Sequence, residues 1–308
     1  MRGVLNLTDI HNQFQVSDNP HIDAKLPLSS TDVGVRTIFV NNHALESFID
    51  NFLDRIQFPF VLISGDSDLS VTDHYPSPEK MQRLLNYSFM QRWYSQNLSL
   101  ENDKLYHIPI GVDFHNLWEK PGKQEPFRWS PLSHEVELKK IITAGKQPDQ
   151  RIPLAYCNWH FTMHRGERAQ CYNETNHALC YFETQKLQRL DAYRAQSNFS
   201  FVLSPQGKGM DCYRTWEALA LGSIPIVKKS PLDPLFSDLP VLILNNWSEL
   251  STDVMQKTLD SFSNRKFNYQ KLFLSYWKKM VADGPDFDRD TALWSREEYM
   301  ERIRLSIL

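Results

Sequence analysis

Short apolar runs alternate with longer helical patterns along the first third of the chain. The runs "TIFV", "FVLIS" and "YHIPIGV" have the length and composition of buried strands, and they lie at residues 37–40, 60–64 and 106–112. The intervening segments predict helices at residues 44–56 and 81–97. Strands separated by helices of this length indicate parallel β-α-β units. We therefore expect a Rossmann-like first domain over residues 1–120.

A second alternation begins after a polar, proline-bearing stretch. Residues 121–151 are expected to connect two domains and to hold one helix, at Pro131–Ala144. Strands are then predicted at Leu154–Cys157, Phe199–Leu203, Ile224–Val227 and Val241–Leu244. A helix is expected at Asp211–Leu221, so residues 152–290 predict a second doubly wound domain. Ligands should bind at the carboxyl ends of the strands, in the central cleft that the two domains face.

The C-terminal segment, residues 291–308, predicts a last helix that packs back on the first domain. Ser295 and Glu298 have the spacing of a capping box. Met300, Ile303 and Ile307 then form one apolar face of that helix.

Composition narrows the function classes. A formal net charge of −3 disfavours a general nucleic-acid binder, which needs a basic surface. The chain shows no secretory signal and no stretch of about 18 apolar residues, so we expect no membrane span. Its four cysteines fit a reducing compartment. These features together predict a soluble, cytoplasmic protein.

The segment "FSFVLSPQGKGMDCYRTWEALALGSIPIVK", residues 199–228, carries the strongest functional signal. A strand ends at Leu203, and a loop precedes a helix whose expected N-cap is Asp211. Glycines in such a loop let backbone N–H groups approach an anion, and the helix N-terminus adds favourable partial charge. The loop residues expected to lie at the donor are Ser204, Gly207, Lys208 and Gly209.

Arg214 and Glu217 lie three residues apart on the predicted helix and share one face. The planar guanidinium suits a diphosphate, and a carboxylate can accept both hydroxyl groups of a ribose. An isolated Arg–Glu pair on a helix is ordinarily a surface ion pair. Here it follows a strand and a two-glycine loop and precedes "EALALGSIPIV", which favours a nucleotide site.

The stretch "SPQGKGMDCYRTWEALALGSIPIV", followed by "LPVLILNNWSEL", resembles the exostosin-like glycosyltransferases. The resemblance is specific over about residues 199–250, and the chain looks like the compact soluble members found in microbes and large viruses. It implies a GT-B fold, an inverting mechanism, a UDP-sugar donor and no required metal or other cofactor. UDP-xylose, UDP-galactose and UDP-glucuronic acid all fit the family's range, and the acceptor would be a glycan or glycoprotein.

Carried over residue by residue, the resemblance places Arg214 on the diphosphate and Glu217 on the ribose. Ser204 and Gly207 would lie in the donor loop. The family has a further arginine after the first strand of this domain. The segment "NWHFTMHRGERAQC" offers Arg168, which we prefer, and Arg165.

The general base is expected in the first domain, at the ends of two predicted strands. An attacking hydroxyl group needs a nearby proton acceptor. In order of preference, the candidates are Asp68, Asp66, His115 and Asp113. Asp66 and Asp68 also form a D-x-D pattern after a strand, the context in which GT-A enzymes bind a divalent ion. A metal-dependent GT-A enzyme is therefore one alternative, and a non-catalytic nucleotide-sugar-binding protein is another.

A zinc site is a weaker alternative for the second domain. Cys157, His160, His164 and Cys171 have the residue types of zinc ligands. They lack the closely spaced pairs of a structural zinc site, and free cysteines are ordinarily small core residues. We predict no metal there.

Overall fold

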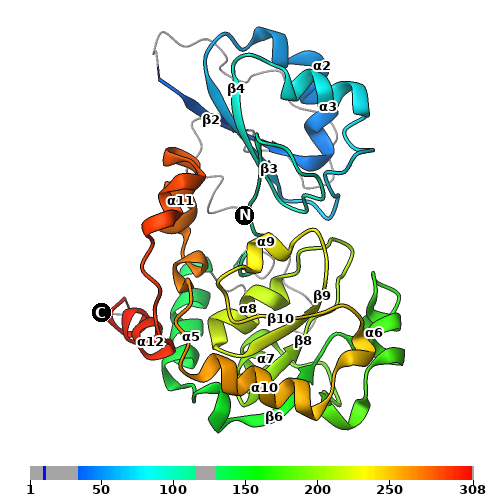
Figure 1. The fold of residues 1–308 in the computed structure, drawn as a ribbon, viewed down its shortest axis with the longest axis vertical. Helices are drawn as coiled ribbons and strands as arrows, with labels where there is room; N and C mark the ends of the chain where they lie inside the picture. The colour runs from blue at the N-terminus through cyan, green and yellow to red at the C-terminus, as the bar shows by residue number, and fades with distance from the viewer. Residues whose placement is uncertain (1–9, 12–33, 115–129, 307–308) are drawn as a thin grey trace. The chain divides into compact units, whose positions relative to one another are not determined.

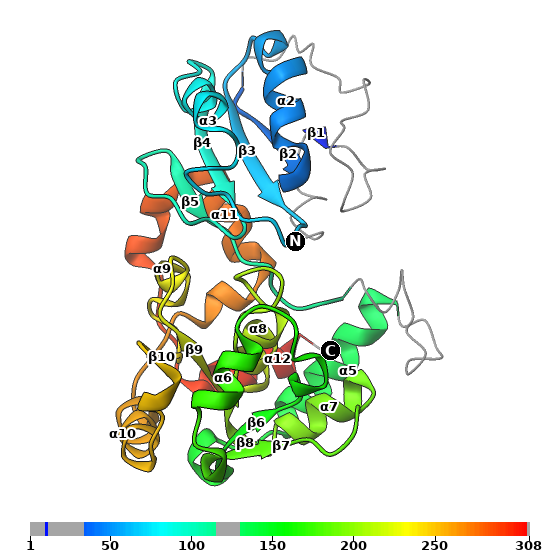
Figure 2. The same ribbon diagram turned by 90° about the vertical axis from the view of Figure 1, so that its right-hand side faces the viewer.

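The computed structural model describes residues 10–11, 34–114 and 130–306. The chain divides into two compact units, drawn in Figures 1 and 2. The first comprises the chain up to Ile110 together with Lys208–Asp211 and Leu274–Arg289. The second comprises Gly111–Gly207, Cys212–Phe273 and Asp290–Leu308. Each unit is an α/β structure built on its own parallel sheet, which confirms the predicted fold class of two Rossmann-like units, the composition of the GT-B fold.

The first unit has a five-stranded sheet in which the strands follow one another in chain order. The strands are β1 (Ile10–His11), β2 (Arg36–Asn41), β3 (Phe60–Gly65), β4 (Met90–Ser95) and β5 (Leu105–His107). Every pairing is parallel, with Ile38 opposite Leu62 in the β2–β3 pair. The helices are α2 (Leu45–Asn51), α3 (Pro78–Leu85) and α11 (Leu274–Asp283), with 3₁₀ turns at Asn42–Ala44 and Leu53–Arg55.

Both faces of this sheet are covered. Side chains of α2 and α3 pack with Ile38, Leu62 and Trp93 in one apolar cluster. On β4, Tyr94 follows Trp93 and so points to the opposite face. Its hydroxyl donates to the carbonyl of Met280 in α11 at 2.7 Å. A segment from the C-terminal part of the chain thus completes the first unit.

The predicted helix at residues 81–97 was wrong. Helix α3 ends at Leu85, and Met90–Ser95 forms strand β4 at the interior of the sheet. A strand buried between two helical layers lacks the alternation of apolar and polar positions that marks a half-exposed strand. Trp93 donates from Nε1 to Ser64 Oγ on β3 at 2.9 Å, a polar contact between strands that the sequence pattern does not reveal.

The second unit has a five-stranded parallel sheet in the order β10-β9-β8-β6-β7. The strands are β6 (Ile152–Cys157), β7 (Cys180–Phe182), β8 (Phe199–Leu203), β9 (Ile224–Lys228) and β10 (Leu242–Leu244). Counted along the chain within this unit, the order is 2-1-3-4-5, a doubly wound arrangement whose switch point lies between β6 and β8. A ligand site is therefore expected beyond the carboxyl ends of those two strands.

Helices cover both faces of the second sheet. They are α5 (Pro131–Ala144), α6 (Arg168–Glu174), α7 (Arg189–Gln196), α8 (Tyr213–Leu221), α9 (Asp233–Phe236), α10 (Thr252–Ser263) and α12 (Arg296–Leu305). Helices α6 and α10 contribute to a cluster with Phe201 and Ile224 on one face. Residues of α5, α8 and α12 form a second cluster, and β8 and α8 meet in a third through Val202 and Ala218. Further 3₁₀ turns of this unit lie at Pro148–Gln150, His160–Thr162, His177–Leu179, Trp247–Glu249 and Tyr269–Leu272, and the turn at Pro285–Asp290 lies mostly in the first unit.

Several predicted elements of this unit are confirmed, and others differ. Strand β8 and helix α5 have the predicted bounds, and the capping box of Ser295 and Glu298 is formed. The three-residue strand β7 was not predicted, because so short a run carries no periodicity. Helix α5, expected in an interdomain connection, buries Leu138 and Ile142 in the core of this unit.

The terminal helix differs from its predicted packing. Tyr299 of α12 donates from its hydroxyl to Ala220 O at 3.0 Å, and Ile303 is buried beside it in the second unit. Ile307 lies outside the described residues. The segment that joins the first unit is instead Leu274–Arg289. None of the helices in the described ranges combines the length and the apolar composition needed to cross a lipid bilayer.

Candidate donor site in the second unit

A cavity of about 290 Å³ opens where strands β6 and β7 end. Strand β6 leads into Asn158 and Trp159, and β7 leads into Glu183. Helix α8, which follows β8, contributes Arg214. The lining residues are Tyr156, Asn158, Trp159, Phe161, Thr162, Arg165, Arg168, Glu183, Lys186, Leu187, Ala192 and Arg214. The cavity therefore lies at the carboxyl edge of the sheet, beside its switch point.

The lining of this cavity is strongly basic, although the chain as a whole is mildly acidic. The cations are Arg165, Arg168, Lys186 and Arg214. Among the described residues that line the cavity, Glu183 alone is acidic. Its Oε2 accepts a hydrogen bond from the Tyr156 hydroxyl at 3.1 Å. Burial is the main cause that lowers the pKa of Arg168, to about 10, and the positive charges of Arg214 and Arg165 act in the same direction. Cys212 raises this pKa, but by less. An oxyanion in the cavity would relieve this mutual repulsion.

Arg168 is positioned by the close packing of two loops. It begins α6, is largely buried, and donates from Nη1 to Trp159 O at 3.3 Å and to Thr162. Gly166 has φ +53, and a Cβ there would overlap the carbonyl oxygen of Gly207. Gln206 N donates to Glu167 Oε1 at 3.0 Å across the same contact. Both Arg165 and Arg168 line the cavity, but only Arg168 is buried and held by these contacts.

Arg214 lies in the first turn of α8, as predicted, and donates from Nη1 to Pro205 O at 3.1 Å. The predicted N-cap was wrong, because Cys212 occupies the N-cap position of this helix, and its Sγ donates to Pro205 O at 3.8 Å rather than capping the helix. The carboxylate of Asp211 instead accepts from Ile110 N at 2.6 Å, within the first unit. Asp211 is therefore engaged in packing and does not line the cavity.

The other predicted loop residues have mixed positions. Ser204 Oγ lies 2.8 Å from Thr215 Oγ1, so this side chain joins the end of β8 to helix α8. A Cβ on Gly207 would lie 3.7 Å from Arg168 Nη2, which places this glycine beside the basic cluster. Lys208 is exposed and, like Gly209, belongs to the first unit. A Cβ on Gly209 would meet Asn97 Nδ2 at 3.0 Å and Asp68 Cα at 3.2 Å, so this glycine lies in close contact with two segments of the first unit.

Glu217 belongs to a buried ionic network. It is 8% exposed, and its Oε1 accepts from Arg189 Nη1 at 2.9 Å and from the Tyr193 hydroxyl at 2.7 Å. Arg189 Nη2 also donates to Asp113 Oδ2 at 2.9 Å. Burial alone lowers the pKa of Arg189, but the nearby groups, chiefly Glu217, raise it above its ordinary value. Glu217 does not line the cavity, so its predicted ribose contact stays a prediction.

The network has a consequence for stability. Replacing Glu217 with alanine leaves the Arg189 guanidinium and the Tyr193 hydroxyl without their shared acceptor, and we expect a loss of about 3–5 kcal/mol in free energy of unfolding. Urea denaturation would measure it. Asp191→Ala is the matched control, because Asp191 pairs with Arg194 on the same helix but both side chains are more than half exposed, 57% and 54%. That variant should change stability by at most about 1 kcal/mol. Equal losses in both variants would contradict a buried network.

The candidate bases have different surroundings. Asp113 is 2% exposed, belongs to the second unit and is engaged by Arg189, which disfavours it as a proton acceptor. His115 lies outside the described residues. Asp66 follows β3 with φ +52, its N donates to Gln96 Oε1 at 3.0 Å, and its O accepts from Asn41 Nδ2 at 2.8 Å. Asp68 is exposed on the same loop of the first unit.

The described residues contain no group of three or more His, Cys, Asp or Glu side chains that could together bind a metal ion. Cys157 and Cys171 are fully buried in the apolar cluster on one face of the second sheet. Burial chiefly raises the pKa of Cys171, which keeps its thiol protonated at neutral pH. These two cysteines thus behave as core residues.

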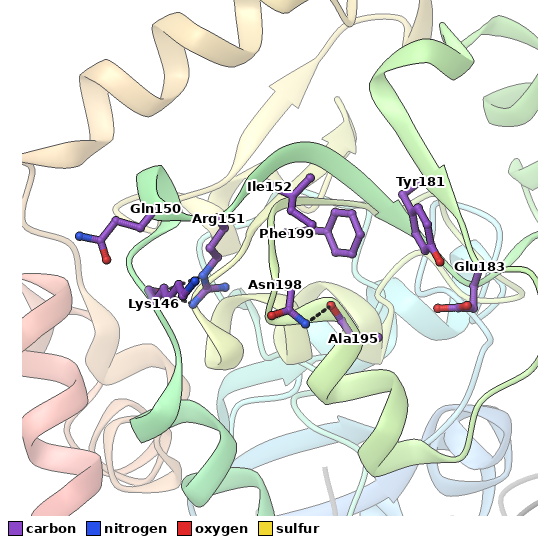
Figure 3. Close-up of a pocket in the computed structure, with 9 residues that line it drawn as sticks. All are labelled: Lys146, Gln150, Arg151, Ile152, Tyr181, Glu183, Ala195, Asn198 and Phe199. Atoms are coloured by element: carbon purple, nitrogen blue, oxygen red, sulfur yellow. Dashed lines mark hydrogen bonds between the residues drawn. The ribbon is translucent and has the colours of Figure 1, made fainter.

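A second cavity, of about 470 Å³, is lined by the first residues of β6 and β8, Ile152 and Phe199, and so reaches the amino edge of the sheet. Figure 3 shows Tyr181 and Phe199 at one part of it and Lys146 and Arg151 at another. The two aromatic rings stack at 5.0 Å. The switch-point rule favours the opposite, carboxyl edge for a nucleotide, where the basic cavity lies.

Sequence comparison identifies a known family over part of the chain. Residues 159–283 match a family model described as the RXYLT1 C-terminal domain, which confirms the resemblance to exostosin-like glycosyltransferases over this part of the chain. The match covers less than half of the chain and includes Arg165, Arg168, Lys186 and Arg214. No curated protein sequence matches the chain.

Among solved structures, the similarity is distant. A UDP-forming trehalose-phosphate synthase from Burkholderia xenovorans is 10% identical, with 88% of this chain and 73% of that chain covered and a TM-score of 0.36. The E. coli trehalose-6-phosphate protein bound with UDP-2-fluoro glucose is 12% identical, with 91% and 74% covered and a TM-score of 0.37. An α1,3-fucosyltransferase with GDP-fucose is 12% identical, with 94% and 95% covered and a TM-score of 0.34.

Proposed function

We propose that this chain, which is a glycosyltransferase, transfers a sugar from a UDP-sugar to a hydroxyl group of a glycan or glycoprotein, with inversion at the anomeric carbon. The basic cavity at the carboxyl edge of the second sheet carries this proposal. Its size and its excess of cations suit a diphosphate.

In the proposed reaction, the acceptor oxygen forms a bond to the anomeric carbon while the bond to the diphosphate oxygen breaks. Negative charge grows on the departing UDP, and fixed cations aimed at it lower the barrier. We assign that role to Arg168 and Arg214, with Arg165 and Lys186 as further cations of the same lining. Arg168 and Arg214 are already held by carbonyl groups of the two loops, so little side-chain reorganisation is needed on binding.

The acceptor hydroxyl must lose a proton, and we assign its removal to Asp68, with Asp66 as the second candidate. Asp68 is exposed, and its carboxylate makes no hydrogen bond with the other residues that the structure describes. An exposed, ionised carboxylate can take a proton from a hydroxyl group within hydrogen-bonding reach.

Glu217 is proposed to bind the ribose through its second oxygen, Oε2, while Arg189 and Tyr193 hold Oε1. Glu217→Gln should then lower the affinity for uridine as well as for UDP by roughly 10-fold, since a hydrogen bond to a charged group contributes about 1.5–3 kcal/mol. Calorimetry with both ligands tests this. Unchanged uridine affinity in a folded Glu217→Gln variant would leave Glu217 with a structural role only.

Metal dependence separates this proposal from the GT-A alternative. If cationic side chains stabilise the leaving group, turnover should stay within about twofold of its value when EDTA is added. Loss of turnover in EDTA, restored by Mn²⁺ or Mg²⁺, would support metal binding by Asp66 and Asp68 instead. The same assay in the Asp66→Asn variant would then show whether that residue is a ligand.

The donor is identified by binding and turnover together. Thermal shifts with UDP, GDP and CDP should be largest for UDP, because a ligand that binds the folded state raises its apparent stability. UDP-xylose, UDP-galactose and UDP-glucuronic acid should then be assayed with a panel of glycan acceptors, UDP-xylose first. UDP binding without turnover on any donor and acceptor pair would favour a non-catalytic binding protein.

A further inference from the structure

Four side-chain amides contact the loop that carries Asp66 and Asp68 in the first unit. The loop follows β3, and the amides lie at the ends of β2 and β4, the two strands that pair with β3. The residues are almost fully buried: Asn41, Asn42, Gln96 and Asn97. Asn and Gln ordinarily lie at the surface, because burying an amide costs free energy unless it forms hydrogen bonds. Four buried amides at one place therefore indicate a role that apolar side chains cannot fill.

The two amides beyond β4 bind the main chain of the loop. Gln96 accepts from Asp66 N at Oε1, at 3.0 Å, and donates from Nε2 to Ser67 O at 3.3 Å. Asn97 donates from Nδ2 to the same carbonyl at 3.0 Å. The side-chain amide of Gln96 forms hydrogen bonds with this loop alone among the described residues.

The β2 side of the loop is held in the same way. Asn41 donates from Nδ2 to Asp66 O and Asn42 from Nδ2 to Leu69 O, each at 2.8 Å. Main-chain atoms are therefore fixed on both sides of Asp68, whose own side chain is exposed. A carboxylate on a backbone that is already fixed loses little conformational entropy when it takes up a reactive position.

A second segment of the first unit, residues 208–211, packs against the same loop. A Cβ on Gly209 would lie 3.2 Å from Asp68 Cα. Asn97 Oδ1 accepts from Asp211 N at 2.7 Å, so this one amide joins the loop to the second segment. Replacing Asn97 would therefore disturb two segments, whereas replacing Gln96 removes contacts with the loop only.

We propose that Gln96 is a positioning residue for sugar transfer: its amide fixes the loop so that the Asp68 carboxylate occupies its reactive position before the acceptor binds. Gln96 itself exchanges no proton and acts only through the loop. The inference rests on the proposed function, in which Asp68 takes the proton of the acceptor hydroxyl group. Proton transfer depends steeply on the distance and alignment of the two groups, so a loosened loop slows the reaction without altering its chemistry.

Gln96→Met tests this role, since methionine keeps the length of the side chain and removes both hydrogen bonds to the loop. Turnover at saturating donor and acceptor should fall by about 10–10²-fold, while UDP affinity should stay within about twofold. Tyr87→Phe is the matched control. It removes one hydrogen bond to a main-chain carbonyl of the first unit, from the Tyr87 hydroxyl to Ile56 O at 2.8 Å, at residues that precede β3 and β4. Turnover of this control should be unchanged.

A double-variant cycle with Asp68→Asn separates positioning from a general loss of structure. If Gln96 acts through Asp68, adding Gln96→Met to Asp68→Asn should change turnover by less than about twofold, because the positioned group is already gone. Losses that multiply would contradict the proposal. Normal turnover in Gln96→Met beside a slow Asp68→Asn variant would overturn the positioning role alone. Normal turnover in Asp68→Asn would overturn the base assignment and the positioning role together.

Amide hydrogen exchange in the unsubstituted protein decides the matter if Gln96→Met fails to fold. With neither donor nor acceptor bound, the Asp66 amide hydrogen, which Gln96 Oε1 accepts, should exchange at least about 10²-fold more slowly than in an unstructured peptide. Exchange as fast as in an unstructured peptide would mean that the loop is not fixed before the acceptor binds, and the proposal would then be wrong.

Discussion

Replacing Arg168 and Arg214 together with alanine is expected to lower the affinity for UDP by about 10²–10⁴-fold, because each side chain supplies a charge-assisted hydrogen bond worth roughly 1.5–3 kcal/mol. Both residues line the basic cavity, and burial leaves Arg168 without competing contacts to bulk water. Calorimetry with UDP measures the effect. Uridine, which carries no phosphate, should lose little affinity in the same variant.

Two comparisons make that result specific to the proposed contact. Arg194→Ala removes an exposed arginine of α7 that pairs with Asp191 and should leave UDP affinity unchanged. The two single variants should show whether the residues act independently, since residues that bind one ligand group are often non-additive. If the double variant is folded and binds UDP normally, the diphosphate does not bind in this cavity.

Replacing Asp68 with asparagine is expected to reduce turnover by about 10²–10⁴-fold while UDP affinity stays nearly constant, the signature of a lost general base. Asparagine keeps the size of the side chain and removes its capacity to accept a proton at neutral pH. Turnover and UDP binding should be measured on the same protein sample, so that any loss of folded protein affects both values.

Asp66→Asn is the matched comparison, because it changes a neighbouring carboxylate on the same loop. A loss confined to Asp66→Asn would assign the base to that residue. Asp66 has φ +52, a conformation that Asn tolerates at least as well as Asp, so the substitution should preserve the loop. If both variants turn over normally, proton removal does not depend on this loop.

The parts of the fold that depend on local patterns could be predicted from the sequence. Strand β8 and Arg214 in the first turn of α8 are local features, and each lies where the pattern places it. Strand β4 was missed because its burial comes from neighbouring strands and helices, which leave no alternation in the segment itself.

The parts of the candidate site that depend on long-range contacts could not be predicted in this way. Arg189 reaches Glu217 across 28 positions of sequence and reaches Asp113 across 76. No spacing rule connects these residues. Arg189 and Glu217 meet only when α7 and α8 pack side by side, and Asp113 comes from a third segment of the chain. The role expected for Asp211 failed for the same reason. Its N-cap position looked favourable locally, but Ile110 N holds its carboxylate.

The contact between Gly166 and Gly207 limits how the loop after β8 can be altered or transplanted. Any side chain at residue 166 would push against the carbonyl oxygens of Gln206 and Gly207, the former at 2.6 Å from a Cβ. The two loops therefore behave as a single module: a design that grafts residues 204–207 into another scaffold must take residues 158–168 with it. During sequence drift, an insertion in either loop would displace Arg168 unless the other loop changed at the same time.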